Sequence, residues 1–154
     1  MLNLPEIKRK KPKAPYRKPD AVKQLERMAD VEARRLHPTM ATEHLAPRTF
    51  RDDSAGSLTI CIVKYITLKG GFASRISSQG TFSRKLNRYI PGTQKKGIAD
   101  IMGTYKSKSL MVEVKMRDKM SVFQEKVRDE QQRSGGLWFT AKNFTEFKVW
   151  FDSI

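Results

Sequence analysis

The hydrophobic and polar positions of the chain first predict a helix with one narrow apolar face. From Asp20, a candidate N-cap behind a proline, apolar residues recur at helical spacing until His37 and the proline after it. We expect this helix to pack on a larger body along that face, and residues 38–56 to form a polar connector. The apolar positions of the helix are Val22, Leu25, Met28 and Val31.

A more apolar segment follows the connector and begins the part of the chain that should hold the core. Residues 57–69 have helical spacing, and two glycines after them provide a helix end. A short strand is predicted over residues 72–76. Residues 77–96 are polar and contain glycine and proline breakers, so we expect loop there with at most one short strand or helix.

Two strand patterns in the second half of the chain predict a hairpin. They cover residues 98–105 and 109–116, and their turn falls near Lys106 and Ser107. The mixture of strands and helices indicates an α/β (α+β) fold. After the hairpin we expect a helix opened by Ser121, a strand over residues 137–141 and a helix from Asn143 whose Phe144, Phe147 and Phe151 belong to the core.

Charge changes this picture by indicating a partner. The net charge is +15 over 154 residues, and residues 1–96 hold 21 Lys and Arg against 8 Asp and Glu. A field of this sign concentrates polyanions, so a nucleic acid is the leading partner. An anionic membrane surface, or a role of the charge in solubility or assembly, remains open.

The proline-rich residues 1–19 carry seven cations and one anion, which predicts a flexible basic arm, either a phosphate-tracking tail or a solvated leader. We therefore divide the chain into this arm, a helix and connector over residues 20–56, and a core domain over residues 57–154. No apolar run approaches the roughly 18–20 residues of a membrane span, and no signal-peptide centre is present, so we expect a cytosolic protein without membrane contact.

The residues that commonly carry metal or nucleophilic chemistry are sparse. Cys61 is the only cysteine, which excludes an internal disulfide framework and a Cys-based zinc site. It lies among aliphatic residues, so we expect a buried and inert thiol. His37 and His44 have no Cys or His set around them that would complete a metal site.

Carboxylates provide a stronger candidate site. Side chains alternate along a strand, so Glu113 and Lys115 should share one face. If the hairpin turn is centred between residues 106 and 107, Asp100 falls opposite Glu113, with Cβ atoms about 5 Å apart. A register slip of one residue would send Asp100 to the other face.

Such a pair of like charges destabilises a sheet unless a cation offsets it. Magnesium fits, because it takes oxygen ligands and retains waters that a substrate phosphate can replace. Lys115 could orient the attacking water or stabilise charge on the phosphate. A Glu-x-Lys pair on a solvated strand is nevertheless common, so the pair alone does not establish a site.

Further motif residues give this pair a context. The ordered series resembles the PD-(D/E)XK nuclease motif, and more narrowly the virus-type replication-repair nucleases (VRR-NUC), including small versions from phages and mobile elements. The resemblance covers about residues 57–152. The matching segments are Gly97-Ile98-Ala99-Asp100, Leu110-Met111-Val112-Glu113-Val114-Lys115, Ser121-x-x-Gln124 and Gly135-Gly136.

The resemblance implies a restriction-endonuclease-like core, a mixed sheet flanked by helices, and hydrolysis of phosphodiester bonds with Mg²⁺, for which Mn²⁺ can substitute. Asp100 and Glu113 would be metal ligands, and Lys115 the catalytic lysine. Gln124 matches a glutamine that supports the site in this family. Ser121 and Gln124 also form a capping box, a purely structural role that is compatible with the first.

The sequence departs from the family pattern in two places. Ala99 stands where the motif has proline, which should matter little because that residue contributes no ligand. The predicted helix over residues 57–69 contains no acid, although relatives commonly place a glutamate there. Asp52 or Asp53 would have to substitute; otherwise two acidic ligands favour one metal ion or weak metal binding.

Several polar residues around the motif are candidates for nucleic-acid contact. Arg75 and Gln79 precede the metal motif in a segment that resembles a substrate-facing loop of these nucleases, and Gly80 would let the backbone approach closely. An ordinary turn is the competing interpretation. The remaining candidates are Lys95, Lys96, Arg117 and Lys119.

The sequence thus predicts a magnesium-dependent endonuclease that acts on DNA, by analogy branched or otherwise structured DNA in replication, repair or recombination. It would work in the cytoplasm of a bacterium or a phage-infected cell, or in association with the nucleoid, and a homodimer would suit junction cutting. The alternative is a basic DNA-binding or assembly module that keeps the fold but has lost catalysis.

Overall fold

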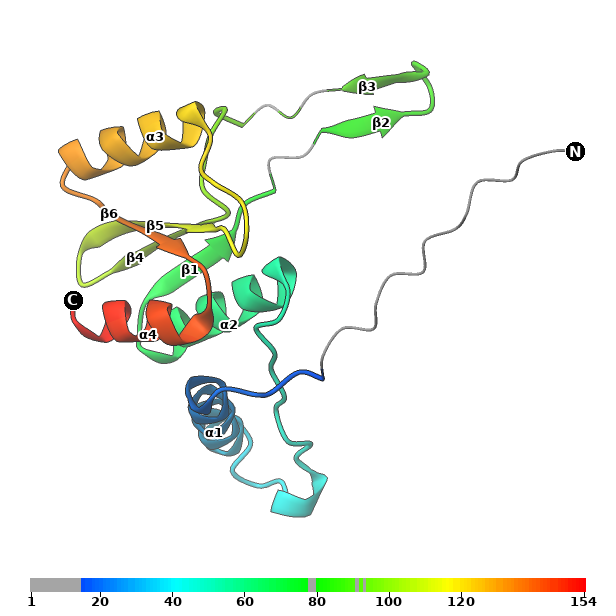
Figure 1. The fold of residues 1–154 in the computed structure, drawn as a ribbon. Helices are drawn as coiled ribbons and strands as arrows, with labels where there is room; N and C mark the ends of the chain where they lie inside the picture. The colour runs from blue at the N-terminus through cyan, green and yellow to red at the C-terminus, as the bar shows by residue number, and fades with distance from the viewer. Residues whose placement is uncertain (1–14, 78–79, 91, 93) are drawn as a thin grey trace, which may run out of the picture.

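A computed structural model describes residues 15–77, 80–90, 92 and 94–154, and it has a mixed sheet flanked by helices (Figure 1). This confirms the α/β class predicted from the sequence. Among the described residues, no helix combines the length and apolar character needed to cross a membrane. The elements are α1 (Asp20–Leu36), a 3₁₀ turn η1 (Thr42–His44), α2 (Ala55–Leu68), β1 (Phe72–Arg75), β2 (Thr81–Ser83), β3 (Arg88–Ile90), β4 (Ile101–Tyr105), β5 (Lys108–Val114), α3 (Val122–Arg133), β6 (Leu137–Ala141) and α4 (Phe144–Asp152).

The main sheet has the strand order β1-β4-β5-β6. Strands β1, β4 and β5 are antiparallel neighbours, and α3 carries the chain across to β6, which runs parallel to β5. Helices α2 and α4 cover one face of this sheet, with α1 packed on them, and α3 covers the other (Figure 1). The larger core therefore lies on the α2 and α4 side, and a smaller cluster lies under α3.

The central hairpin has the predicted register. Lys106 and Ser107 form its turn with φ of 46° and 62°, the left-handed values that a two-residue turn of type I′ requires. Tyr105 pairs with Lys108 and Ile101 pairs with Val112. The two strands are shorter than the sequence pattern suggested: β4 begins only at Ile101, and β5 ends at Val114 after pairing with β6.

Helix α1 begins where predicted but buries a different face. Its N-cap is Pro19 rather than Asp20, and Asp20 instead forms an ion pair with Lys23 in the first turn. Val31 is 65% exposed, so its assignment to the apolar face was wrong. At about 100° per residue, Val31 lies far around the helix from Ala29. The buried side is formed by Ala21, Val22, Leu25, Ala29 and Ala33, whose short alanines allow close packing.

Helix α2 ends at the predicted glycine pair. Gly70 has a φ of 83°, and the N–H groups of Gly70 and Gly71 donate to the carbonyl oxygens of Thr67 and Ile66. This is a Schellman end, and it directs the chain into β1. The helix starts two residues earlier than predicted, with Ser54 as its N-cap.

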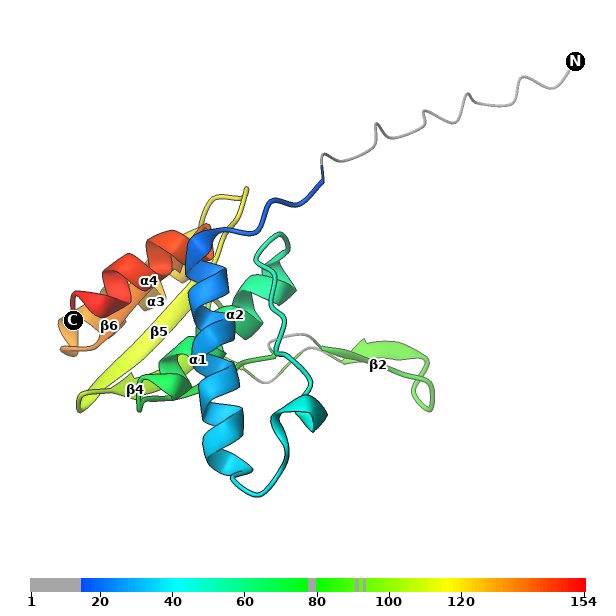
Figure 2. The same ribbon diagram turned by 90° about the horizontal axis from the view of Figure 1, so that it is seen from below.

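The segment between β1 and β4 differs from the expectation. Instead of loop with at most one strand, it contains β2 and β3, an antiparallel pair separate from the main sheet. This pair projects from the body in both views (Figures 1 and 2). Since the pair covers no core, the alternation of apolar and polar residues that would predict half-buried strands is missing.

The expected core aromatics are confirmed. Phe144, Phe147 and Phe151 are at most 1% exposed, and Trp150 stacks at the edge of this cluster on Phe139. Cys61 is also buried, and burial raises the pKa of its thiol to about 12, which agrees with an inert role.

Candidate active site

Asp100 and Glu113 meet at one end of the main sheet. Ile101 pairs with Val112, so continuation of the register places Asp100 opposite Glu113, as the sequence predicted. The backbone N–H of Val114 donates to Oδ2 of Asp100 over 2.9 Å. The backbone oxygen of Asp100 accepts from the N–H of Ile76 over 2.7 Å, which ties this position to the end of β1.

Glu113 is almost completely buried, with 2% exposure. Its Oε1 contacts the Nζ of Lys115 at 3.2 Å and also accepts a hydrogen bond from the side-chain amide of Gln124. Its Oε2 is buried and has no hydrogen-bond partner in the part of the chain that the structure describes. A buried carboxylate oxygen without a partner is costly, so an electropositive ligand would stabilise this atom.

The electrostatics of Glu113 agree with that interpretation. Burial, followed by the negative charge of Asp100, raises the pKa of Glu113, while Lys115 acts in the opposite direction. The net direction means that Lys115 does not offset the combined effect of burial and the charge of Asp100. A divalent cation between them would do so.

Gln124 makes both of the contacts that its sequence context allows. Its Oε1 accepts from the backbone N–H of Ser121 over 2.8 Å, which completes the capping box of α3. Its Nε2 points the other way and donates to Glu113. The helix cap therefore fixes the orientation of the amide that holds Glu113.

Gly97 has a role that the sequence pattern alone did not reveal. Its φ is 86°, and a Cβ added there would lie 2.4 Å from the carbonyl oxygen of Phe123. A side chain at this position would push the chain away from the first turn of α3. The glycine thus lets the segment leading to Asp100 pass close to Gln124.

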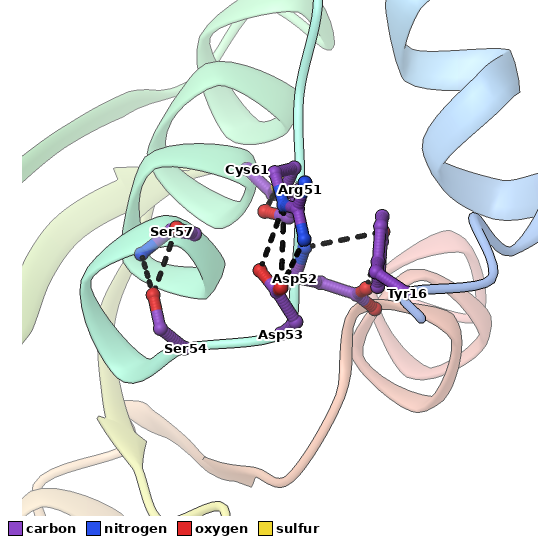
Figure 3. Close-up of polar contacts among 7 residues, drawn as sticks. All are labelled: Tyr16, Arg51, Asp52, Asp53, Ser54, Ser57 and Cys61. Carbon is purple, nitrogen blue, oxygen red and sulfur yellow. Dashed lines mark hydrogen bonds and ion pairs between the residues drawn. The ribbon is translucent and has the colours of Figure 1, made fainter. Parts of the chain in front are cut away.

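Asp52 and Asp53 do not complete the site. Asp52 is 6% exposed and accepts hydrogen bonds from the Tyr16 hydroxyl over 2.8 Å and from the Phe144 N–H over 3.3 Å. Asp53 forms an ion pair with Arg51 (Figure 3). Across residues 15–77, 80–90, 92 and 94–154, no group of three or more Asp, Glu, His or Cys could hold a metal.

The contact of Asp52 with Tyr16 was not predicted. Figure 3 shows Tyr16 directed at Asp52, and the guanidinium carbon of Arg51 lies 4.4 Å from the centre of the tyrosine ring. The two contacts fasten the chain just before α1 to the start of α2. Asp52 is therefore a structural residue that joins Tyr16 to the beginning of α4.

The predicted nucleic-acid contacts differ in their surroundings. Arg75 ends β1, and its backbone pairs with Ile101 beside Asp100. Lys96 lies 3.8 Å above the ring of Phe123, whereas Lys95 is ion-paired with Glu130. Gln79 lies outside the described residues. The described candidates are all exposed, namely Arg75, Lys95, Lys96, Arg117 and Lys119.

Comparison of the chain with protein-family models, curated proteins and solved structures gives no match. The resemblance to PD-(D/E)XK nucleases therefore rests on the motif residues and their spacing.

Proposed function

We propose that the chain is a divalent-metal-dependent nuclease that hydrolyses phosphodiester bonds of DNA. The observation that carries this proposal is the buried Oε2 of Glu113, which lacks a partner in the described part of the chain, together with the neighbouring Asp100. A structural ion pair with Lys115 alone would not account for an Oε2 that is buried without a partner in the described part of the chain, or for a second acid beside it.

The donor set fits a hard cation. Asp100 and Glu113 would hold one Mg²⁺ or Mn²⁺, and water and a substrate phosphate would fill the remaining positions. When bound, such an ion lowers the pKa of a coordinated water and offsets negative charge on the phosphate. With two carboxylates in the described site, we favour a single ion.

The side chains of the chain itself supply positioning and charge. Lys115 is 22% exposed on its side chain, so its ammonium group can face both Glu113 and solvent, where it would orient the attacking water or stabilise the phosphate in the transition state. Gln124 holds Glu113 in place through an amide that is itself fixed by the helix cap.

The topology supports assignment to the PD-(D/E)XK type. The order of α2, three antiparallel strands that include the hairpin, α3 and a parallel β6 is the arrangement that the motif resemblance implies. The net charge of +15 and the exposed cations near Asp100 support a polyanionic substrate. By analogy with VRR-NUC proteins, we propose branched or structured DNA.

Three substitutions test the assignment. Asp100→Asn and Glu113→Gln should abolish single-turnover cleavage and weaken Mg²⁺ binding in calorimetry while DNA binding remains, because each removes ligand charge. Lys115→Ala should keep metal affinity but lose cleavage, because it removes only the transition-state charge. The matched controls are Asp118→Asn, at an exposed residue nearby, and Lys108→Ala, at the exposed other end of β5.

The substrates should be labelled linear, flapped, forked and four-way DNA, each with Mg²⁺ and with Mn²⁺. Cleavage at the parent rate by both carboxylate variants would show that the site is wrongly assigned. A parent that binds DNA but cleaves none of these substrates would instead support the inactive DNA-binding module.

A further inference from the structure

The β2–β3 hairpin leaves the body beside the proposed active site. We use the name ribbon for its residues 80–90. Before the ribbon, Arg75 pairs with Ile101, and the N–H of Ile76 donates to the backbone oxygen of Asp100. After the ribbon, the chain returns to Asp100 itself. Both ends of the ribbon therefore connect to the part of the chain around Asp100.

The ribbon belongs to a long stretch without negative charge. No Asp or Glu occurs from residue 54 to residue 99, whereas eight Lys and Arg do. Three of these cations lie on the ribbon, at Arg84, Lys85 and Arg88. This composition is complementary to a polyanion and unfavourable for a basic partner, including a second copy of this chain.

The ribbon also exposes large apolar side chains. Phe82 and Tyr89 are cross-strand partners, so both rings stand on the same face, and they are 55% and 59% exposed. A Cβ at Gly80 would lie 2.2 Å from the backbone oxygen of Ile90 and 2.7 Å from the Tyr89 ring, so a side chain there would displace the partner strand. Two exposed rings on a face without a core indicate that a partner covers them.

We propose that the ribbon recognises unpaired bases of branched DNA, with Phe82 and Tyr89 stacking on the bases and the ribbon cations contacting the adjacent phosphates. Rings and cations interleaved on one element are the combination that binds single strands, because every base offers a stacking face. This inference rests on the proposed function in one respect: it places the branch point beside Asp100 and Glu113.

The test compares metal-free binding to forked and linear DNA, with 2-aminopurine at the first unpaired position of the fork. The double variant Phe82→Leu/Tyr89→Leu keeps apolar side chains but removes the rings. We expect it to bind the fork roughly tenfold more weakly and to lose the 2-aminopurine quenching, while binding to linear duplex hardly changes. Phe72→Leu is the matched control, since Phe72 is 67% exposed at the other end of β1.

Unchanged fork affinity and unchanged quenching in the double variant would overturn the proposal. An equal loss on fork and linear duplex would also overturn it, as would a change of oligomeric state in sedimentation without a loss of fork affinity. Cleavage of the same fork by the parent with Mg²⁺ is measured in a separate assay. The ribbon proposal can therefore fail while the nuclease assignment stands, and the nuclease assignment can fail while the ribbon proposal stands.

Discussion

Magnesium should stabilise the folded chain through Glu113 and Asp100, and Glu113→Gln should remove that stabilisation. The reasoning starts from the Oε2 atom of Glu113, which is buried without a partner in the described part of the chain. A cation that binds this atom binds only the folded state, because the two carboxylates meet only when β4 and β5 pair. Binding is therefore linked to the free energy of unfolding.

The magnitude follows from one site. At a free Mg²⁺ concentration ten times Kd, the free energy of unfolding should rise by about 1.4 kcal/mol. For a chain of this size, that corresponds to a Tm increase of about 3–6 °C. A further tenfold increase in Mg²⁺ should add about 1.4 kcal/mol more, since one ion contributes RT ln 10 per decade. Differential scanning calorimetry across a Mg²⁺ series measures both values.

Without Mg²⁺, the parent should be less stable than Glu113→Gln, and the pH dependence of this difference in stability tests the reason. Because burial and Asp100 raise the pKa of Glu113, its ionisation opposes folding. Below the ordinary pKa of 4.5 this penalty is absent, because Glu113 is protonated in both the folded and the unfolded state. As pH rises above that value, the parent should lose stability relative to Glu113→Gln, and the difference should level off above the folded-state pKa.

A Tm that rises equally with Mg²⁺ in the parent and in Glu113→Gln would refute this reasoning. The exposed Asp118→Asn variant is the control for general ionic effects and should respond to Mg²⁺ as the parent does. Measurements at constant ionic strength are needed, since the high positive charge makes unspecific salt effects large.

Two further predictions concern the N-terminal region. Residues 1–14 hold five cations and one anion. Their removal should reduce the slope of log binding constant against log salt concentration by about 0.9 per lost phosphate contact, measured by fluorescence anisotropy. An unchanged slope would identify a passive leader. Tyr16→Phe should lower the free energy of unfolding by about 1.5–3 kcal/mol in urea titration, because the buried Asp52 loses a hydrogen-bond donor. Tyr89→Phe, at an exposed ring, is the control. An equal effect of both variants would contradict a special role for the Asp52 contact.

The sequence predicted the central hairpin well because its information is local. The two-residue turn fixes the register, and the last pair of that register, Ile101 with Val112, leaves Asp100 and Glu113 as the next residues on the two strands. The signals for the end of α2 and the start of α3 are equally local, since a glycine and a capping box specify them within a few residues.

Long-range contacts were beyond the reach of the same reasoning. Asp52 was a candidate metal ligand because it precedes a helix, but its partners Tyr16 and Phe144 are 36 and 92 residues away. Nothing in the local pattern specifies these contacts. The ribbon was missed for a different reason, since its strands pair with each other and cover no core.

Gln124 shows why a sufficient local explanation of a residue does not exclude a function. A capping box accounts for its position completely, and on that basis alone a catalytic interpretation adds nothing. The amide, however, has an acceptor and donors at separate atoms. In the structure Oε1 accepts from Ser121, which leaves Nε2 free to donate to Glu113. The cap restricts the amide to the orientation that the site requires, so the structural role is the means by which Gln124 supports Glu113.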